Sequence, residues 1–383
     1  MIQNYLRVST FLLVLYLFLL AFMGRFIRET DLDYIISILM VSWSGIAFIS
    51  FKWSKYDLAW APSLLIAIVY LVIYLFEVVH QFNPIIQCLI FFIPVVSLLT
   101  RYVEIDSNQF TNLVFLLSVT CLLGFVPFFD EVITALTSSY ERSRFHTFFS
   151  IAICFPIVSI LISGLVDSKR KLYFLIFVLV IFSGSAAHRS LYLAFVVQFI
   201  YWAYINGNGK SLIRPLIGCF FGGVLLLMTD FGGVILQKFF DSAAGHDGNT
   251  ESRLFYYGEI FRHSFEEFLG IGFGEYFRYG RDSKGELVPY ALQHNSYLSY
   301  LYFVGWPSFL LVIFWKAKLY LSVVNYDDVL VKVVATSLVG MSFFSILNVY
   351  LEQPIFGFSY WVLFGVLIGL VTRKATSIKF GDQ

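Results

Sequence analysis

The sequence predicts an all-α polytopic membrane protein with about twelve transmembrane helices. Of its 383 residues, 59% are hydrophobic and 13% are charged, whereas soluble domains are about half apolar and a quarter charged. So little charge cannot cover the surface of a soluble protein of this length. The net charge of +1 gives no indication of a nucleic-acid partner.

The predicted spans follow from the thickness of a bilayer, whose hydrocarbon core of about 30 Å needs about 20 mostly apolar residues per helix. The predicted segments are Val8–Met23, Tyr34–Phe51, Leu58–Val79, Pro84–Leu99, Phe110–Phe129, Thr147–Val166, Leu172–Ser183, Ser190–Ile205, Pro215–Leu236, Ser296–Trp315, Val329–Tyr350 and Gly357–Val371. Together they form a single integral membrane domain over residues 1–383.

The orientation follows from the cations, because Lys and Arg concentrate in cytoplasmic loops. With a cytoplasmic N-terminus, about 15 of the 26 cations fall on the inner side. They include the run Lys169–Lys171 and, after the tenth segment, Lys316 and Lys318. About 18 of the 25 acids fall outside. We therefore expect both termini to be cytoplasmic.

One long connection, residues 237–295, lies between the ninth and tenth predicted spans on the extracytoplasmic face. Apolar residues recur at helical spacing over Glu251–Phe268, which predicts a helix on the membrane face with its aromatic side against the bundle. The run Gly270–Gly274 follows. A dinucleotide fingerprint needs a strand before its glycines, so we expect Gly272 and Gly274 to form a turn that brings backbone amides close to another group.

Three residues are candidates for chemistry. Arg189 lies between two apolar runs, where it either binds an anion or anchors its helix at the outer interface. Arg253 opens the loop helix, whose free N–H groups favour anions, although a solvated charge is the simpler interpretation of its position. His294 directly precedes the tenth span, where it is either a base near neutral pH or an interfacial hydrogen-bonding residue.

Other patterns of residues bear on cofactors and on substrate. No HExxH or CxxC pattern is present and no acidic pair stands out in the outer loops, so we expect no metal or other cofactor. Glu352 lies in the last outer turn, where it either reaches the same mouth of the bundle as His294 or is a simple interfacial acid.

The motifs in residues 180–310 resemble the O-antigen ligase/polymerase superfamily of bacterial membrane glycosyltransferases. The resemblance rests on four segments in order: Ser183–Arg189, the loop helix from Arg253, Leu269–Gly274, and His294–Leu298 running to Gly305. Two features depart from the family pattern. The serine and arginine that the family places together are here Ser185 and Arg189, and Tyr256-Tyr257 stands where a Trp often follows the loop arginine.

This resemblance implies a fold of the GT-C type in the bacterial inner membrane. The donor would be a glycan on undecaprenyl pyrophosphate, used on the periplasmic face without metal or nucleotide. Arg189 and Arg253 would stabilise the departing pyrophosphate and His294 would be the base. The substrate-binding residues would be Tyr256, Gly272, Gly274, Asn295 and Glu352. The partners would be a glycan or lipid A–core acceptor, the lipid bilayer, a flippase and a chain-length regulator.

Three functions compete. We favour a polymerase that joins lipid-linked O-antigen or capsule repeat units over a ligase that transfers the finished chain to lipid A–core. Both need the same donor chemistry. A lipid-linked sugar flippase or another transporter ranks lower, because transporters tend to have related halves and broken helices, and the sequence indicates neither.

Overall fold

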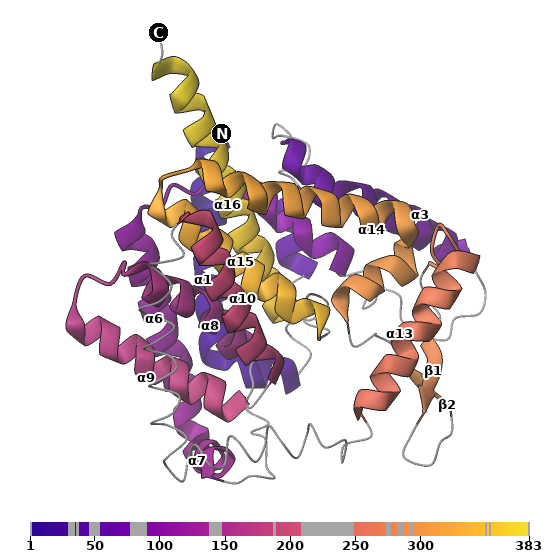
Figure 1. The fold of residues 1–383 in the computed structure, drawn as a ribbon, viewed down its shortest axis with the longest axis horizontal. Coiled ribbons are helices and arrows are strands. Elements are labelled where there is room, and N and C mark those ends of the chain that lie inside the picture. The colour runs from indigo at the N-terminus through magenta and orange to yellow at the C-terminus, as the bar shows by residue number, and fades with distance from the viewer. Residues whose placement is uncertain are drawn as a thin grey trace.

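The computed structural model describes residues 2–29, 35, 38–45, 54–76, 90–137, 148–186, 189–207, 249–272, 277–281, 287–290, 295–348, 351 and 354–381. Within these residues the fold is helical apart from one antiparallel hairpin of two strands, β1 (Phe277–Arg281) and β2 (Leu287–Tyr290). The predicted all-α class is thus confirmed for the body of the protein (Figure 1).

The helices mostly coincide with the predicted spans. Those of the first half are α1 (Ile2–Glu29), α3 (Ala61–Phe76), α5 (Ser97–Thr100), α6 (Ser107–Phe125), α7 (Phe129–Thr137), α8 (Phe148–Ser163), α9 (Lys169–Ala186) and α10 (Arg189–Ile205). Those of the second half are α13 (Asn249–Glu266), α14 (Ser296–Ser322), α15 (Val329–Ile346) and α16 (Pro354–Gly381). The predicted span Pro215–Leu236 lies outside the described residues.

Local sequence explains where several helices begin. Asp106 and Gln109 form a capping box at the start of α6, each side chain bonding the other's backbone N–H. The Asp328 carboxylate accepts hydrogen bonds from the N–H groups of Leu330 and Val331 at the start of α15. Pro354, which has no N–H to leave unsatisfied, is the first residue of α16.

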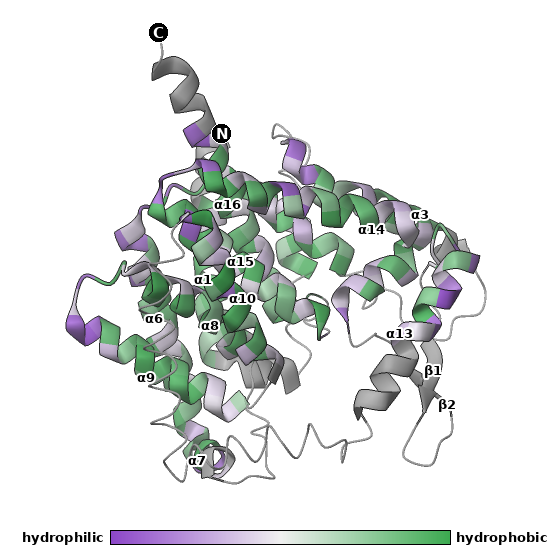
Figure 2. Cartoon of the chain, viewed as in Figure 1, coloured by the Kyte–Doolittle hydropathy of each residue, from purple (hydrophilic) through white to green (hydrophobic). Residues whose placement is uncertain are grey.

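Within the described part of the chain, four helical segments are long and apolar enough to cross a membrane. They are Ser107–Thr134, Ser296–Asn325, Val329–Ile346 and Ile355–Lys374. Five shorter apolar helical segments accompany them. Apolar side chains run along these helices and polar ones concentrate toward their ends (Figure 2).

The core lies where α15 packs against α8, α10 and α16. The rings of Phe155 and Phe344 lie 5.6 Å apart there. The Gln198 amide of α10 donates to the Phe155 carbonyl and to the Ser159 hydroxyl, both at 3.0 Å. A polar side chain buried among apolar helices needs such partners, so Gln198 joins α10 to α8.

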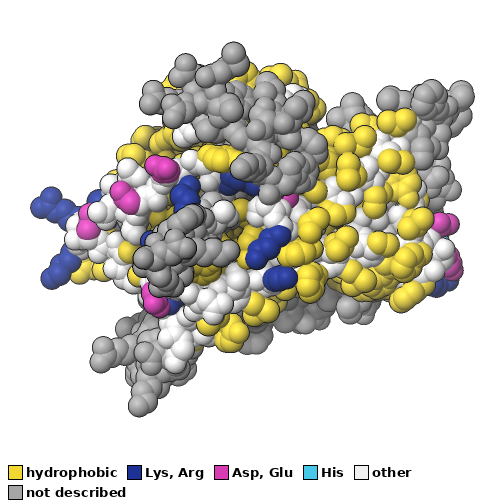
Figure 3. Space-filling view, turned by 90° about the horizontal axis from the view of Figure 1, so that it is seen from above, with side chains coloured by type: hydrophobic (Ala, Val, Ile, Leu, Met, Phe, Trp, Pro, Cys, Tyr) yellow, Lys and Arg dark blue, Asp and Glu magenta, His cyan; other side chains and the backbone are white. Residues whose placement is uncertain are grey.

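An apolar surface covers the side of the molecule formed by α3 and α14 (Figure 3). Leu65 and Val69 of α3, and Leu310 and Phe314 of α14, are exposed. A soluble protein would not leave so much apolar area in water. This face suits contact with lipid chains.

Two arginines, Arg101 and Arg373, have structural roles. Arg101 is buried and forms a bidentate ion pair with the fully buried Asp57. The Nη1–Oδ2 distance is 3.0 Å. Arg373 of α16 donates to the carbonyl oxygens of Arg101 and Val103, both at 3.2 Å. The start of α1 and the end of α16 lie at the same end of the molecule (Figure 1).

Candidate functional site

Helix α14 is broken at Gly305, whose φ of 74° and ψ of 179° are not helical. The segment before the break, Ser296–Val304, is here called the α14 arm. Every residue of the arm is buried, and at 1.5 Å per residue it is about 13 Å long. A short buried half-helix inside a membrane bundle is a structure that membrane proteins commonly use to build sites. The expectation that no helix is broken is therefore wrong.

The break is closed by the segment Phe268–Gly272, here called the glycine loop. Breaking a helix leaves backbone groups without partners, which is costly in a membrane. The glycine loop supplies those partners: the N–H of Ile271 donates to Tyr302 O at 2.9 Å and that of Gly272 to Phe303 O at 3.2 Å. The N–H of Trp306 in turn donates to Phe268 O at 3.0 Å.

Glycine is required where the two backbones meet. Gly270 has a φ of +92°, and a Cβ added to it would lie 2.6 Å from Gly305 N and from Phe303 O. The predicted turn thus brings backbone amides close to another group, and for Gly272 that group is the backbone of the α14 arm. Gly274 lies outside the described residues.

At the end of the arm opposite the break, its first residue, Ser296, takes part in a set of hydrogen bonds. We call the residues Ser190, Ser296 and Asn348 the serine–asparagine cluster. The Asn348 amide donates to the Ser190 hydroxyl at 2.8 Å. The N–H and hydroxyl of Ser296 both donate to Asn348 O, at 3.3 and 3.2 Å. The N–H of Leu351 donates to the Ser296 hydroxyl at 3.0 Å. The cluster therefore ties together the starts of α10 and α14 and the turn before α16.

Asn295 positions the arm from its first residue. Its side-chain oxygen accepts from the N–H groups of Tyr297 and Leu298, at 2.9 and 3.1 Å. It is therefore the N-cap of α14. Its side chain is largely buried, so its visible role is to fix the start of the arm.

The cluster lies within a few residues, along the chain, of three of the predicted site residues. Arg189 is the first residue of α10 and precedes Ser190. His294 precedes Asn295 and Glu352 follows Leu351; both lie outside the described residues. Segments that lie more than 50 residues apart in the sequence are thus brought together. The hypothesis that His294 and Glu352 lie at the same mouth of the helical bundle requires this.

Arg253 and Tyr256 lie in α13, which contacts α14 near the break. The rings of Phe261 and Phe265 lie 6.3 and 5.3 Å from that of Trp306. The described residues do not connect α13 with the serine–asparagine cluster. Arg189 is thus next to the cluster because it precedes Ser190 in the chain. Arg253 and Tyr256 belong to α13, which contacts α14 at the other end of the arm.

The predicted orientation of α13, with its aromatic side against the bundle, holds only in part: Tyr257 packs against the core, but the later rings are exposed. Ile260 and Ser264 are the buried residues of its last turns, whereas Phe265 is 71% and Phe268 56% exposed. The reason is that the apolar side of a membrane protein's helix need not face the core, because lipid satisfies it equally well. The aromatic stripe therefore lies beside Trp306 at the surface.

Two helices, α10 and α14, begin at the serine–asparagine cluster. Each helix N-terminus carries a partial positive charge that favours anions. The first N–H groups of α14 already donate to Asn348 and Asn295. An anion here would therefore be attracted by the helix dipoles, and would not take those N–H groups as direct ligands.

Sequence reasoning missed Lys316. The tenth predicted span ended at Trp315 and placed Lys316 in an inner loop, but α14 continues to Ser322. Lys316 is 3% exposed. Its Nζ lies 5.0, 4.6 and 4.7 Å from the ring centroids of Tyr297, Tyr360 and Trp361. The apolar residues that follow Lys318 could have indicated that the helix continues past Lys316.

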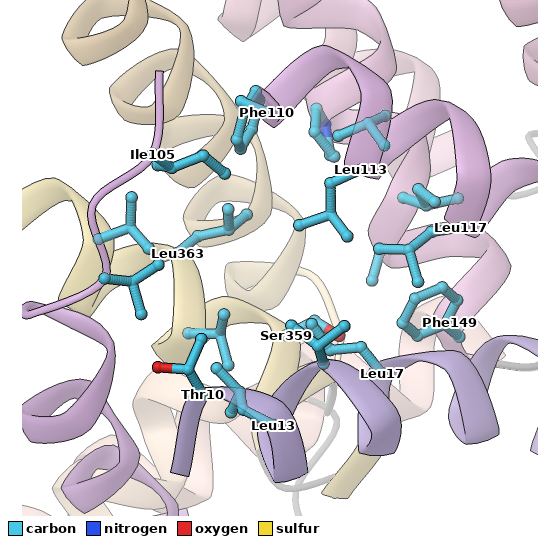
Figure 4. Close-up of a pocket in the computed structure, with 18 residues that line it drawn as sticks. Thr10, Leu13, Leu17, Ile105, Phe110, Leu113, Leu117, Phe149, Ser359 and Leu363 are labelled. Atoms are coloured by element: carbon cyan, nitrogen blue, oxygen red, sulfur yellow. The ribbon is translucent and has the colours of Figure 1, made fainter. Parts of the chain in front are cut away.

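An apolar cavity of about 100 Å³ lies between α1, α6, α8 and α16. Leu13, Leu117 and Leu363 are among its lining residues, and Thr10 and Ser359 are the two polar ones (Figure 4). No lining side chain is an acid, a base or a metal ligand. The cavity suits a hydrocarbon chain, and chemistry must take place elsewhere.

Comparison with known proteins identifies no relative of this chain. No protein-family model matches it, and no curated protein matches it. The functional interpretation therefore depends on the residues and on the geometry described above.

Proposed function

We propose that the chain is a membrane glycosyltransferase of the GT-C type with about twelve spans. In this proposal it joins undecaprenyl-pyrophosphate-linked repeat units of an O-antigen or capsule on the periplasmic face of the bacterial inner membrane, with both termini in the cytoplasm. One observation carries the proposal. The serine–asparagine cluster joins the starts of α10 and α14, and Arg189 and His294 are the chain neighbours of that cluster.

The proposed glycosyl transfer needs few groups from the protein. An acceptor hydroxyl oxygen forms a bond to the anomeric carbon of the donor sugar, and the bond from that carbon to the pyrophosphate oxygen breaks. The hydroxyl proton goes to His294, and the pyrophosphate leaves as an anion on its lipid. A lipid pyrophosphate is already activated, so the reaction needs no nucleotide.

Two kinds of group would supply the catalysis. Arg189, at the start of α10, and Arg253, in the first turns of α13, would stabilise the charge of the departing pyrophosphate. One such charge-stabilising donor is typically worth about 10²–10³ in rate. A general base such as His294 contributes about 10²–10⁴.

Partners follow from the same proposal. The donor's polyprenyl chain would lie along the apolar surface of the bundle, and a flippase would deliver it to the outer leaflet. Tyr256, Gly272, Gly274, Asn295 and Glu352 remain the proposed substrate-binding set. The N–H of Gly272 is engaged with Phe303, so any contribution from that residue must come through the shape of the glycine loop.

The broken helix favours a second candidate, a transporter of lipid-linked glycans, because discontinuous helices are common in transporters. Two observations weigh against it. The break at Gly305 is closed by three backbone hydrogen bonds to the glycine loop, and the arm is buried along its whole length. A gate that moves would have to give up those bonds.

Purified protein in detergent, given lipid-linked repeat units, tests the proposal. A polymerase makes longer lipid-linked glycans from repeat units alone. A ligase makes product only when lipid A–core is added, and a transporter makes none in either case. A lipopolysaccharide gel of a deletion strain gives the matching result in cells: loss of a polymerase leaves one repeat unit on the core, and loss of a ligase leaves none.

A further inference from the structure

Lys316 is the buried cation that the proposed chemistry does not use. Among the described residues its ammonium has no hydrogen-bond acceptor. Its surroundings are instead the three rings of Tyr297, Tyr360 and Trp361, all within 5.0 Å of Nζ. We call this arrangement the lysine cage. A buried ammonium is unfavourable unless other groups compensate it, and ring faces attract cations most strongly where water is excluded.

The lysine cage joins parts of the protein that the break in α14 separates. In a continuous helix, Tyr297 and Lys316 would be about 28 Å apart. Because α14 turns back at Gly305, the two residues meet. Tyr297 belongs to the arm, Lys316 to the second limb of α14, and Tyr360 and Trp361 to α16. The ammonium is thus a bridge among three helical segments.

The α16 side of the lysine cage is held by other contacts. The Tyr360 hydroxyl lies 2.7 Å from that of Tyr320 and 3.0 Å from that of Ser342. The ring of Trp361 packs edge-on against Phe364, with centroids 5.0 Å apart. Removing the lysine charge would therefore leave Tyr360 and Trp361 in place. The Tyr297 hydroxyl is also hydrogen-bonded to Ser342 and Tyr360, so the ammonium adds to the contacts that hold the arm against α16.

Tyr297 directly follows Asn295 and Ser296, which anchor the arm to the serine–asparagine cluster. We propose that Lys316 is a positioning residue: its ammonium holds the arm against α16 and thereby sets the position of Asn295, the N-cap of α14. An anion-binding role is disfavoured, because the negative ring faces that attract the ammonium repel an anion. The link to catalysis rests on the function proposed above; the link to the arm does not.

The test compares four variants of the full chain. Lys316→Met removes the charge and keeps most of the length of the side chain, and Lys316→Arg keeps the charge. Lys318→Met is the matched control, because Lys318 is an exposed lysine two residues on that lies 4.6 Å from the ring of Trp315. Tyr297→Leu removes the arm's ring and leaves the lysine, which provides a second route if Lys316→Met does not accumulate.

The first readout needs no activity. Ser299→Cys places a nearly isosteric thiol on the buried arm, and maleimide labelling is compared with that of the parent protein, in which Cys121 and Cys154 are buried. We expect Lys316→Met and Tyr297→Leu, each combined with Ser299→Cys, to raise the labelling rate of the introduced thiol at least about tenfold over that in Ser299→Cys alone. Lys316→Arg should restore most of the protection and Lys318→Met should change nothing. Unchanged labelling in Lys316→Met overturns the proposal.

The second readout is the kinetics of glycan extension. A positioning role predicts that Lys316→Met lowers kcat at least about tenfold with KM for the donor nearly unchanged, and that Lys316→Arg recovers much of it. Faster labelling with unchanged kcat would show that the arm's position does not matter to the reaction, which also overturns the proposal. If the unsubstituted protein makes no product, the proposed function fails, and the labelling still decides the role of Lys316 in the arm.

Discussion

Two buried cations show how single residues are accommodated inside this bundle. The Arg101 guanidinium is paired with a buried carboxylate, Asp57, whose Oδ2 also accepts from the N–H of Ser54 at 2.6 Å. Lys316 has aromatic rings in place of a carboxylate. In the sequence both look like ordinary cations flanking a span. Only the packing distinguishes them from solvated charges.

Replacing Arg101 should be severe. The Arg101→Met variant leaves the Asp57 carboxylate buried without its partner, and breaking a buried pair in this way typically costs about 3–5 kcal/mol. Lys171→Met is the control, since Lys171 and Asp167 form an exposed pair whose worth is at most about 1 kcal/mol. Thermal unfolding in detergent measures both. A loss for Arg101→Met no greater than that for Lys171→Met would contradict the structural role of the pair.

The glycine loop gives a second prediction at this scale. In Gly270→Ala, a non-glycine residue must adopt a positive φ, at about 1–3 kcal/mol, and its Cβ would lie too close to the backbone of Phe303 and Gly305. Gly258→Ala in α13 meets no atom within 4 Å and should be neutral or stabilising by up to about 1 kcal/mol. Equal melting temperatures for the two variants would show that the glycine loop does not close the break.

At the scale of elements, α14 is where sequence and structure differ most. Its composition predicts one span, and the sequence contains Gly305 and Pro307 within it. These residues permit a break but do not require one. The break forms because the glycine loop, more than 30 residues earlier in the chain, satisfies the backbone groups that it exposes. The sequence of α14 alone does not show that a distant segment will form hydrogen bonds with its backbone.

The junction between α14, α15 and α16 is sensitive to pH. Burial of the Asp328 carboxyl favours a raised pKa, but the hydrogen bond and charge of Lys374, together with the N–H groups of Val331 and Leu330, outweigh it and lower the pKa below its ordinary value of 3.8. A carboxyl group whose pKa is lowered in the folded state stabilises the folded protein at pH values above its ordinary pKa. That stabilisation is lost as the pH falls through the folded-state pKa.

Asp328→Asn keeps a capping oxygen and removes the charge that pairs with Lys374 at 3.0 Å. We expect the variant to be less stable than the unsubstituted protein at pH 7, by no more than about 1 kcal/mol because the pair is partly exposed. The difference should shrink as the pH falls below about 4. Asp327→Asn, at an exposed neighbour, is the matched control. A difference that is constant with pH would contradict the assignment.

For the whole molecule, hydropathy predicts most of the helices that the structure describes. The segments predicted from Thr147, Ser190 and Val329 match α8, α10 and α15 within a few residues, and the segment predicted from Val8 lies inside the longer α1. They do so because length and apolarity are local properties. The hairpin of β1 and β2 and the outward face of α13 were not predicted. Both depend on which surface meets lipid and which meets protein, and hydropathy does not separate these two environments.

The candidate site was predictable in part. The family resemblance implied that Arg189 and His294 share a site, and it was left open whether Glu352 reaches the same place. The hydrogen bonds among Ser190, Ser296 and Asn348 bring together the segments next to these residues. Neither the cluster itself nor the lysine cage could be predicted. Serine, asparagine and lysine at helix ends are common, and their significance comes from contacts between distant helices.

The most direct measurement of the central claim is glycan extension by purified protein on lipid-linked repeat units. It compares His294→Ala and Arg189→Ala with Lys284→Ala, which removes a cation of the long connection 237–295 that has no role in the proposed site. All three proteins should insert and accumulate. We expect no detectable product from His294→Ala and Arg189→Ala, because the base or the charge stabilisation of the pyrophosphate is lost. Lys284→Ala should retain near-normal extension. Full extension by a well-expressed His294→Ala protein would contradict the proposed mechanism.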